Sequence, residues 1–162
     1  MATEVKFPTT AAVHFLRQNG VAFEPALYRY EGRIEVAKTA AAAIGALEES
    51  VYKTLVVSCE DEPLVVLMDA AGTVSMGKLA AVTGHKSKAS ACAPRDAERL
   101  TAYQVGGISP FGTRQKMRVV VDELALLQES IWVNGGSHGF MVKLATKDLV
   151  RVLDATVADI RQ

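Results

Sequence analysis

Apolar residues fall in short runs along this chain, separated by glycine, proline and charged residues. The clearest run covers residues 51–57, which are rich in β-branched and aromatic side chains and therefore predict a strand. Asp61-Glu62-Pro63 predicts a turn after it, so residues 64–68 should pair back as the next strand. Residues 117–121, 130–134 and 140–144 predict further strands, and residues 21–30 predict an extended segment.

Helix signals occur between these runs. A hydroxyl or proline residue opens most of them, and glycine closes several. Helices are expected from Thr9 or Thr10 to Asn19-Gly20, over 35–44 to Gly45, from Ser75 to Gly84, from Pro94 through residue 100, and from a Thr146 cap through residue 150.

Strands and helices are mixed without strict alternation, which is typical of an α+β fold with a mixed sheet. A chain of 162 residues suits one domain with a sizeable core. We find no internal repeat, linker or low-complexity segment, so residues 1–162 are expected to form a single domain.

The charge balance limits the partners. Lys and Arg together number 18, as do Asp and Glu, so the net charge is zero and bulk attraction to DNA or other polyanions is not indicated. No secretion signal or membrane-spanning run is present, so we expect a cytoplasmic protein without a membrane partner. Cys59 and Cys92 match no metal or redox spacing, and we expect reduced thiols, no metal and no cofactor.

The least ordinary stretch, which we name the glycine loop, is Gly106-Gly107-Ile108-Ser109-Pro110-Phe111-Gly112. Its glycines permit unusual backbone conformations and leave the main chain bare, while the proline stiffens it. A tight structural turn and a ligand-binding loop are both compatible with this pattern.

Few side chains offer chemistry. Lys53 lies inside the first strand, where it could be a solvent-facing residue or an ammonium aimed at a substrate oxygen. Ser109 lacks the G-x-S-x-G elbow of a serine hydrolase, because Phe111 replaces the last glycine. His14, His85 and His138 offer no strong catalytic partner. Only His138 lies near a plausible site, and a surface turn residue is its simpler interpretation.

Two basic groups lie on either side of the glycine loop in sequence. They would form a solvated surface or, if they flank the loop in space, hold a phosphate backbone. Their members are Lys78, His85, Lys86 and Lys88 before the loop, and Arg114, Lys116 and Arg118 after it.

Three motifs together resemble the YbaK/EbsC family, which is related to the editing insertion domain of bacterial prolyl-tRNA synthetases. They are Val51-Tyr52-Lys53-Thr54-Leu55-Val56, the glycine loop, and Ile131-Trp132-Val133-Asn134-Gly135-Gly136. The resemblance covers nearly the whole chain. It implies a compact α+β domain with a mixed, barrel-like sheet that hydrolyses the ester of mischarged aminoacyl-tRNA, typically cysteinyl-tRNA(Pro).

The resemblance also implies roles for single residues. Lys53 matches the essential strand lysine that positions the acyl group and the tRNA 3′ end. Gly106 and Pro110 match a G-x-x-x-P loop whose backbone holds the terminal adenosine and the aminoacyl carbonyl. Tyr28 and Thr54 match pocket positions.

The other residues assigned to substrate binding by the resemblance are Gly107, Ile108, Ser109 and Gly136. In the cysteine-specific branch no protein nucleophile is needed, because the substrate's own thiol is proposed to attack its ester. Backbone donors near the developing oxyanion would then supply much of the acceleration.

This sequence departs from the family pattern at several positions. Ser137-His138 replaces a Lys-Arg pair between Gly136 and Gly139, Met141 stands where a polar or acidic residue is common, and Ala102 replaces a glycine. These departures concern the amino-acid specificity rather than the fold.

The leading function is therefore deacylation of aminoacyl-tRNA, most simply Cys-tRNA(Pro), with the tRNA 3′ end and prolyl-tRNA synthetase as expected partners. The alternatives are a deacylase for another acyl group (Ala or Ser), a non-catalytic tRNA- or synthetase-binding module, and, least favoured, a serine hydrolase using Ser109.

Overall fold

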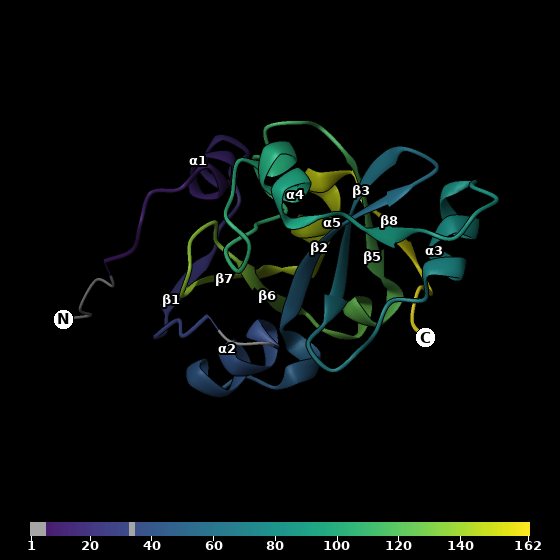
Figure 1. Cartoon of the computed structure of the whole chain (residues 1–162). Coiled ribbons are helices and arrows are strands. Elements are labelled where there is room, and N and C mark those ends of the chain that lie inside the picture. The colour runs from purple at the N-terminus through teal and green to yellow at the C-terminus, as the bar shows by residue number, and fades with distance from the viewer. Residues whose placement is uncertain (1–5, 33–34) are drawn as a thin grey trace.

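The computed structural model describes residues 6–32 and 35–162 of the chain, and its β-strands form two sheets (Figure 1). The larger sheet has the strand order β4-β2-β3-β5-β8, and the smaller one has the order β1-β7-β6. An isolated parallel bridge between Val51 and Trp132 joins the larger sheet to the smaller one.

The larger sheet is built on the hairpin of β2 (Tyr52–Cys59) and β3 (Glu62–Asp69), where Lys53 pairs with Met68 and Thr54 with Leu67. The short β4 (Ser90–Ala91) pairs with β2 only at Val57 and Ser58. On the far side, β5 (Arg118–Asp122) runs parallel to β3, and β8 (Thr156–Ala158) runs parallel to β5. The predicted mixed sheet is therefore confirmed.

The smaller sheet is antiparallel. Its central strand β7 (Phe140–Ala145) pairs with β1 (Glu24–Leu27) on one side and with β6 (Ser130–Asn134) on the other. The α+β class is confirmed, but barrel-like closure is wrong. Neither sheet is closed, because β4 and β8 are edges of the larger sheet and β1 and β6 are edges of the smaller one.

Five α-helices cover the sheets, and all five were predicted. Thr10 caps α1 and Ser75 caps α3 through their side-chain oxygens, while α2 and α3 end at left-handed Gly45 and Gly84. Their bounds are α1 Ala11–Gln18, α2 Val36–Ile44, α3 Met76–Thr83, α4 Pro94–Thr101 and α5 Thr146–Leu153, and the 3₁₀ helices are Glu48–Ser50 and Glu123–Leu127. None of the described helices is long and apolar enough to cross a membrane.

The cap predicted for the last helix is wrong. Thr146 is the first residue of α5 rather than its cap, and its hydroxyl donates a hydrogen bond to the carbonyl of Gln128 at 2.6 Å. Because the side chain is turned toward the preceding turn, it ties the start of α5 to the end of the 3₁₀ helix before β6.

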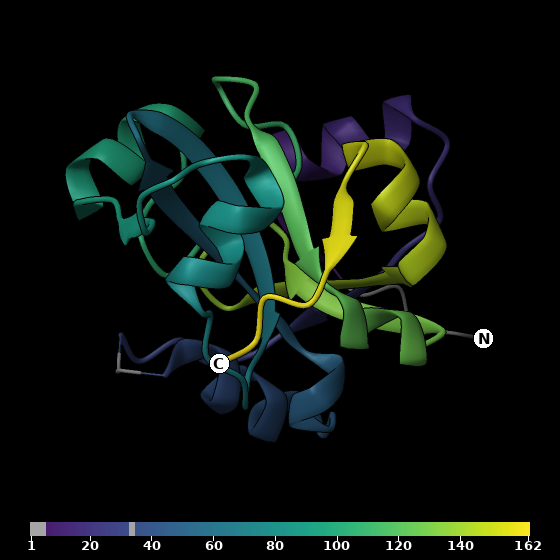
Figure 2. The same ribbon diagram turned by 90° about the vertical axis from the view of Figure 1, so that its right-hand side faces the viewer.

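Two apolar layers pack on the two faces of the larger sheet. One face carries Tyr52, Val65 and Leu67 into the core shared with α1, α5 and the smaller sheet. The other face carries Val57, Leu64 and Val66 against α3, where Leu79 is fully buried. Alternate residues of one strand thus pack into opposite layers, because successive side chains of a strand point to opposite faces of the sheet. In Figure 2, α3 and the C-terminal segment lie on the side facing the viewer.

Charged side chains form a cluster at the β2–β3 turn, outside the core. His85 contacts Glu60 at 3.1 Å and Glu62 at 2.8 Å through its two ring nitrogens, and Arg118 pairs with Glu62. The hydrogen bonds that His85 donates to Glu62 and Glu60 raise the pKa of its imidazole above the ordinary 6.5. The pKa of Glu62 is lowered to about 2, chiefly by Arg118. His85 therefore stabilises the turn, and a phosphate contact by His85, one of the two alternatives for its basic group, stays a prediction.

We expect the stabilisation from His85 to depend on pH. Because its folded pKa lies above 6.5, the contribution is fully present below that value and is lost as the pH rises through the folded pKa. The difference in free energy of unfolding between wild type and His85→Gln should thus be largest below pH 6.5 and shrink as the pH rises above it. Urea unfolding at several pH values measures it, with His14→Gln, at an exposed helix position, as control. A difference that grows with pH would contradict this role.

Candidate functional site

A cavity of about 530 Å³ is lined by β2, α2, α4 and residues of the glycine loop, and Asn134 and Met141 of the smaller sheet also line it. It is mostly apolar, with a few polar groups, which is typical of a small-molecule site. Its polar and charged members among the described residues are Tyr28, Glu35, Lys38, Tyr52, Lys53, Thr54, Cys92 and Asn134.

The edge of β2 forms the back of this cavity. Six consecutive residues, 52–57, line it, although their side chains alternate between the two faces of the sheet. The strand thus presents its edge to the cavity, because β4 covers that edge only from Val57 onward. This placement explains how Lys53 and Thr54, which point to opposite faces, reach the same space.

Lys53 is half-buried at this edge. Its ammonium donates a hydrogen bond to the carbonyl of Gly72 at 2.8 Å. Burial lowers the pKa of Lys53 below its ordinary 10.5, and the nearby Asp69 opposes this shift. Since an ammonium has three donors, Lys53 keeps further hydrogen-bonding capacity while its position is fixed.

Two more polar groups belong to the cavity wall. The hydroxyl oxygens of Tyr28 and Thr54 are buried and make no hydrogen bond within the described part of the chain. Burial, and then the neighbouring Tyr30, raise the pKa of Tyr28, so its hydroxyl stays protonated and can donate. A buried hydroxyl without a partner is costly, and a ligand oxygen or nitrogen would relieve this cost.

Gly106 and Ile108 of the glycine loop, with the preceding Val105, form another wall of the cavity. The amide N–H groups of Gly106 and Ile108 have no acceptor among residues 6–32 and 35–162, and this leaves two backbone donors for a ligand. Gly106 has φ +90°, and a methyl group there would overlap the Tyr30 hydroxyl. Glycine is therefore required twice over, for its conformation and for the close approach of Tyr30.

Tyr30 and His138 hold this loop from outside. Their rings stack with centroids 4.1 Å apart, and His138 Nε2 lies 2.8 Å from the carbonyl oxygen of Val105. A surface turn histidine was the simpler interpretation of His138, and the residue is indeed exposed. Its observed partners show that it fixes the loop.

Asn134 connects the loop to the neighbouring glycine turn. Its amide nitrogen donates to the carbonyl of Gly106 at 3.2 Å, and its side-chain oxygen accepts from the backbone N–H of Gly136 at 2.7 Å. Sequence reasoning missed this residue. An asparagine directly before Gly-Gly at a strand end is a signal for such a turn and could have identified it.

The structure separates the predicted site residues into two groups. Tyr28, Lys53, Thr54, Gly106 and Ile108 line the cavity together. The remaining four support the walls instead, and the residues concerned are Gly107, Ser109, Pro110 and Gly136. Substrate contact by these four stays a prediction.

Three of those supporting residues have a local structural reason for their identity. A methyl group at Gly107 would lie 3.0 Å from the backbone of His138, and one at Gly136 would lie 2.7 Å from the ring of Tyr103. Ser109 is fully buried, and its hydroxyl oxygen accepts from the N–H of Phe111 at 3.3 Å. Because Ser109 Oγ has no accessible surface, the structure gives no support to its use as a hydrolytic nucleophile.

The cavity lacks an activated nucleophile among its described lining residues. No serine or histidine lines it. Cys92 does, but burial and then Asp96 raise the pKa of its thiol, so the thiol stays protonated and a weak nucleophile. Cys59 and Cys92 are both free thiols, as expected.

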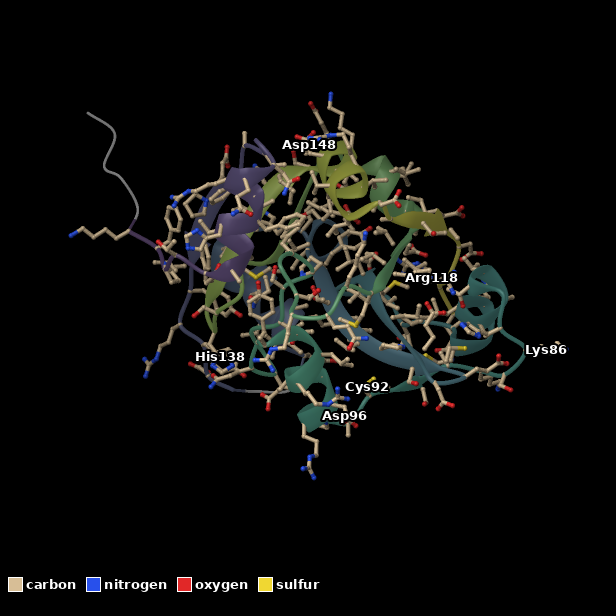
Figure 3. All side chains as sticks on the ribbon, turned by 90° about the horizontal axis from the view of Figure 1, so that it is seen from above. Lys86, Cys92, Asp96, Arg118, His138 and Asp148 are labelled. Carbon is tan, nitrogen blue, oxygen red and sulfur yellow. The ribbon has the colours of Figure 1, made fainter. Side chains whose placement is uncertain are left out.

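The two basic groups do not flank the loop as a pair. Lys78 binds Asp159, and Arg118 binds Glu62, so part of each group is neutralised by ion pairs. Figure 3 shows Lys86 at the opposite end of the molecule from His138, which contacts the loop. The cations that do line the cavity are Lys38 and Lys53. Among residues 6–32 and 35–162, no group of His, Cys, Asp and Glu could hold a metal ion.

Replacing Gly106 tests the close approach of the loop and Tyr30. Gly106→Ala should lower the free energy of unfolding by about 1–2 kcal/mol from backbone strain, and further because Tyr30 must move. Gly20→Ala is the matched control, since Gly20 also has positive φ but has nothing within 4 Å of an added methyl group. Chemical unfolding measures the loss in free energy of unfolding for both variants. Equal losses would show that Tyr30 does not restrict the side chain at position 106.

Solved structures share this fold. A crystal structure of a candidate trans-editing enzyme for prolyl tRNA synthetase matches with a TM-score of 0.81 at 23% identity, covering 96% of this chain and 99% of the other. A hypothetical protein matches with a TM-score of 0.84 at 20% identity, covering 94% and 99%. A scaffold protein from an epitope-grafting design matches with 0.81 at 22% identity, covering 94% and 95%. At these identities the likeness establishes the fold.

The sequence itself matches a family model over residues 33–152, about three quarters of the chain. The family is described as the aminoacyl-tRNA editing domain. The match includes Lys53, the glycine loop and Gly136, so nearly the whole cavity lies within it. This chain therefore belongs to the aminoacyl-tRNA editing domain family.

Proposed function

We propose that this protein is a trans-acting aminoacyl-tRNA deacylase that hydrolyses the ester of a mischarged tRNA, with Cys-tRNA(Pro) as the leading substrate. One observation carries the proposal beyond family membership. Lys53 on the β2 edge and the glycine loop line the same cavity, where the buried hydroxyls of Tyr28 and Thr54 have no hydrogen-bond partner in the described part of the chain. The acceptor stem's terminal adenosine and its aminoacyl group would enter this cavity.

The available donors suit ester hydrolysis. An aminoacyl ester is already activated, so the main requirement is to position it and to stabilise the oxyanion that forms at its carbonyl. The N–H groups of Gly106 and Ile108 can donate to that oxygen, and the Lys53 ammonium adds a positive charge at the same cavity. In a largely apolar cavity such donors act more strongly than in water.

The attacking group is proposed to come from the substrate. With a cysteinyl ester, the substrate sulfur attacks the carbonyl carbon, the ester C–O bond breaks, and the ribose oxygen leaves with the proton of the thiol. The product is a cyclic thioester of cysteine, whose new C–S bond is then hydrolysed by water to give free cysteine. The protonated Cys92 and the buried Ser109 agree with a reaction that uses no protein nucleophile.

The side chains around the cavity favour a small apolar or thiol-bearing acyl group. Leu55, Ile108 and Met141 line it, together with Met76 and Val57. A thiol transfers into such surroundings more readily than a hydroxyl, which would need a hydrogen-bond partner. This supports cysteine over serine, whereas discrimination against alanine needs the measurement described below.

The proposed partners follow from the charge. A single domain with zero net charge should hold a whole tRNA weakly, so prolyl-tRNA synthetase would help to deliver the substrate. We place this reaction in the cytoplasm, where tRNA is charged, and treat residues 1–162 as one catalytic domain.

Removing the ammonium tests the reaction. Lys53→Ala should reduce kcat/KM for deacylation of Cys-tRNA(Pro) by at least about 100-fold, because it removes a charged donor from the cavity. Lys88→Ala, at an exposed position, is the matched control and should keep the wild-type rate. Circular dichroism shows whether both variants fold. Full activity in folded Lys53→Ala would defeat the assignment.

A panel of charged tRNAs separates the remaining alternatives. Initial rates on Cys-, Ala-, Ser- and Pro-charged tRNA identify the acyl group. Activity on alanyl- or seryl-tRNA alone would transfer the proposal to that substrate. Inactivity on all four, with tRNA binding retained, would instead identify a non-catalytic binding module.

Thr54 allows stability and activity to be separated. Its hydroxyl is buried without a partner, so Thr54→Val should raise the free energy of unfolding by about 1 kcal/mol. The same change should slow deacylation, because the ligand loses that hydroxyl. Chemical unfolding and single-turnover rates measure the two effects. Thr101→Val is the contrasting control, since the Thr101 hydroxyl donates to Ala97 at 2.8 Å and its loss should destabilise the fold. A Thr54→Val protein that is less stable would argue against an unpaired hydroxyl.

A further inference from the structure

The loop that holds Lys53 is itself held by the C-terminal end of the chain. Gly72, whose carbonyl accepts from the Lys53 ammonium at 2.8 Å, lies in the loop between β3 and α3. Arg161 pairs through its guanidinium with Asp69, the last residue of β3. Arg161 lies beyond the family match, which ends at residue 152, so family membership assigns no role to this contact.

Backbone pairing attaches the same two segments to each other. Val74 and Arg161 form an isolated antiparallel bridge. The N–H of Ser75 donates to the carbonyl of Ile160 at 2.7 Å, and the N–H of Gln162 donates to that of Thr73 at 2.9 Å. Figure 2 shows the C-terminal segment continuing from β8 to end below α3. The loop that carries Gly72 is thus paired along its length with residues 160–162.

Packing leaves Gly72 little room. It is buried, and a methyl group on it would overlap Arg161 Nη1 and would lie 2.6 Å from Met68 Sδ and 2.8 Å from Asp69 Oδ1. Arg161 therefore contacts the very residue whose carbonyl binds Lys53. A shift of the guanidinium would free Gly72 to move, and Lys53 with it.

The buried carboxylates beside Arg161 fix the position of its guanidinium more strictly. Asp69 is 4% exposed, and Arg161 also lies 3.6 Å from Asp122, which is fully buried. Two carboxylates inside the protein require a cation nearby, so the guanidinium is confined to one place. The planar guanidinium fixes the direction of its hydrogen bonds as well as the position of its charge, whereas a lysine ammonium would fix only the charge.

We propose that Arg161 is a positioning residue for Lys53, acting through Asp69 and the carbonyl of Gly72. It is not among the residues that line the cavity, and it acts by fixing the loop. The C-terminal segment thereby contributes to the reaction, because it fixes the position of Lys53. The catalytic consequence rests on the function proposed above, whereas the placement of Lys53 can be measured without any substrate.

The direct readout is the Lys53 side chain. Lysine labelled with ¹³C at Cε gives one NMR signal per lysine, and Lys53 is the signal absent from Lys53→Ala. In Arg161→Met the pKa of Lys53 should rise toward 10.5, because the side chain becomes less buried and the repulsion from Arg161 is removed. In Arg161→Lys the positive charge is kept, so a rise in the Lys53 pKa there reports the change of position alone. Arg161→Lys keeps the charge without the planar guanidinium, so it should restore the rate only in part. Arg151→Met, which removes an exposed ion pair on α5, is the matched control and should leave the Lys53 signal unchanged.

The kinetic readout is a fall of about 10- to 100-fold in kcat for Arg161→Met, with KM little changed, as expected when a group is misplaced rather than lost. If the unpaired Asp69 prevents folding, the double variant Arg161→Met/Asp69→Asn removes the buried charge and takes its place in the kinetic readout, because loss of Asp69 by itself lowers the pKa of Lys53. An unchanged Lys53 signal in the folded variant would overturn the proposal, as would a moved signal with an unchanged kcat. If Lys53→Ala keeps full activity, the proposed role of Lys53 fails, and the NMR titration alone then decides whether Arg161 fixes it.

Discussion

The site depends on an edge of β2 that no strand covers. Trp132 bridges to Val51 at one end of this edge, and Ala91 pairs with Val57 at the other. An open edge inside a protein presents unpaired backbone groups and is normally covered or blocked. Here the glycine loop, α2 and the start of α4 enclose it without pairing to it, and the enclosed space is the cavity. The extreme shortness of β4 is therefore what makes room for a substrate.

Both walls of the cavity are fixed by contacts with neighbouring elements. The glycine loop is fixed by Asn134 from the end of β6 and by the stacked pair of Tyr30 and His138. On the other side, the Lys53 ammonium is fixed by the carbonyl of Gly72. Donors held in this way need little reorganisation when charge develops on a substrate, which is how a site without a protein nucleophile can still accelerate ester hydrolysis. His138 adds a ring stack with Tyr30 to this support of the loop.

Local signals in the sequence predicted most of the fold. The β-branched run of β2, the Ser75 cap and the glycines after α2 and α3 act through neighbouring residues, so they can be interpreted without the rest of the chain. The open sheets were not predictable in this way, because closure depends on pairing between distant strands such as β8 and β5. Within the site, Lys53 and Gly106 were identified through the family motifs. Asn134 and Arg161 were missed because their partners lie 28 and 92 residues away in sequence.

The most direct test of the central claim is to locate the aminoacyl end on the protein. A non-hydrolysable amide of cysteine with 3′-amino-3′-deoxyadenosine can be titrated into ¹⁵N-labelled protein. The account predicts that the amide signals of Gly106 and Ile108 shift together, with changes at Thr54 on the facing β2 edge. Shifts confined to the basic surface around Lys86, with the glycine loop and β2 unchanged, would contradict it.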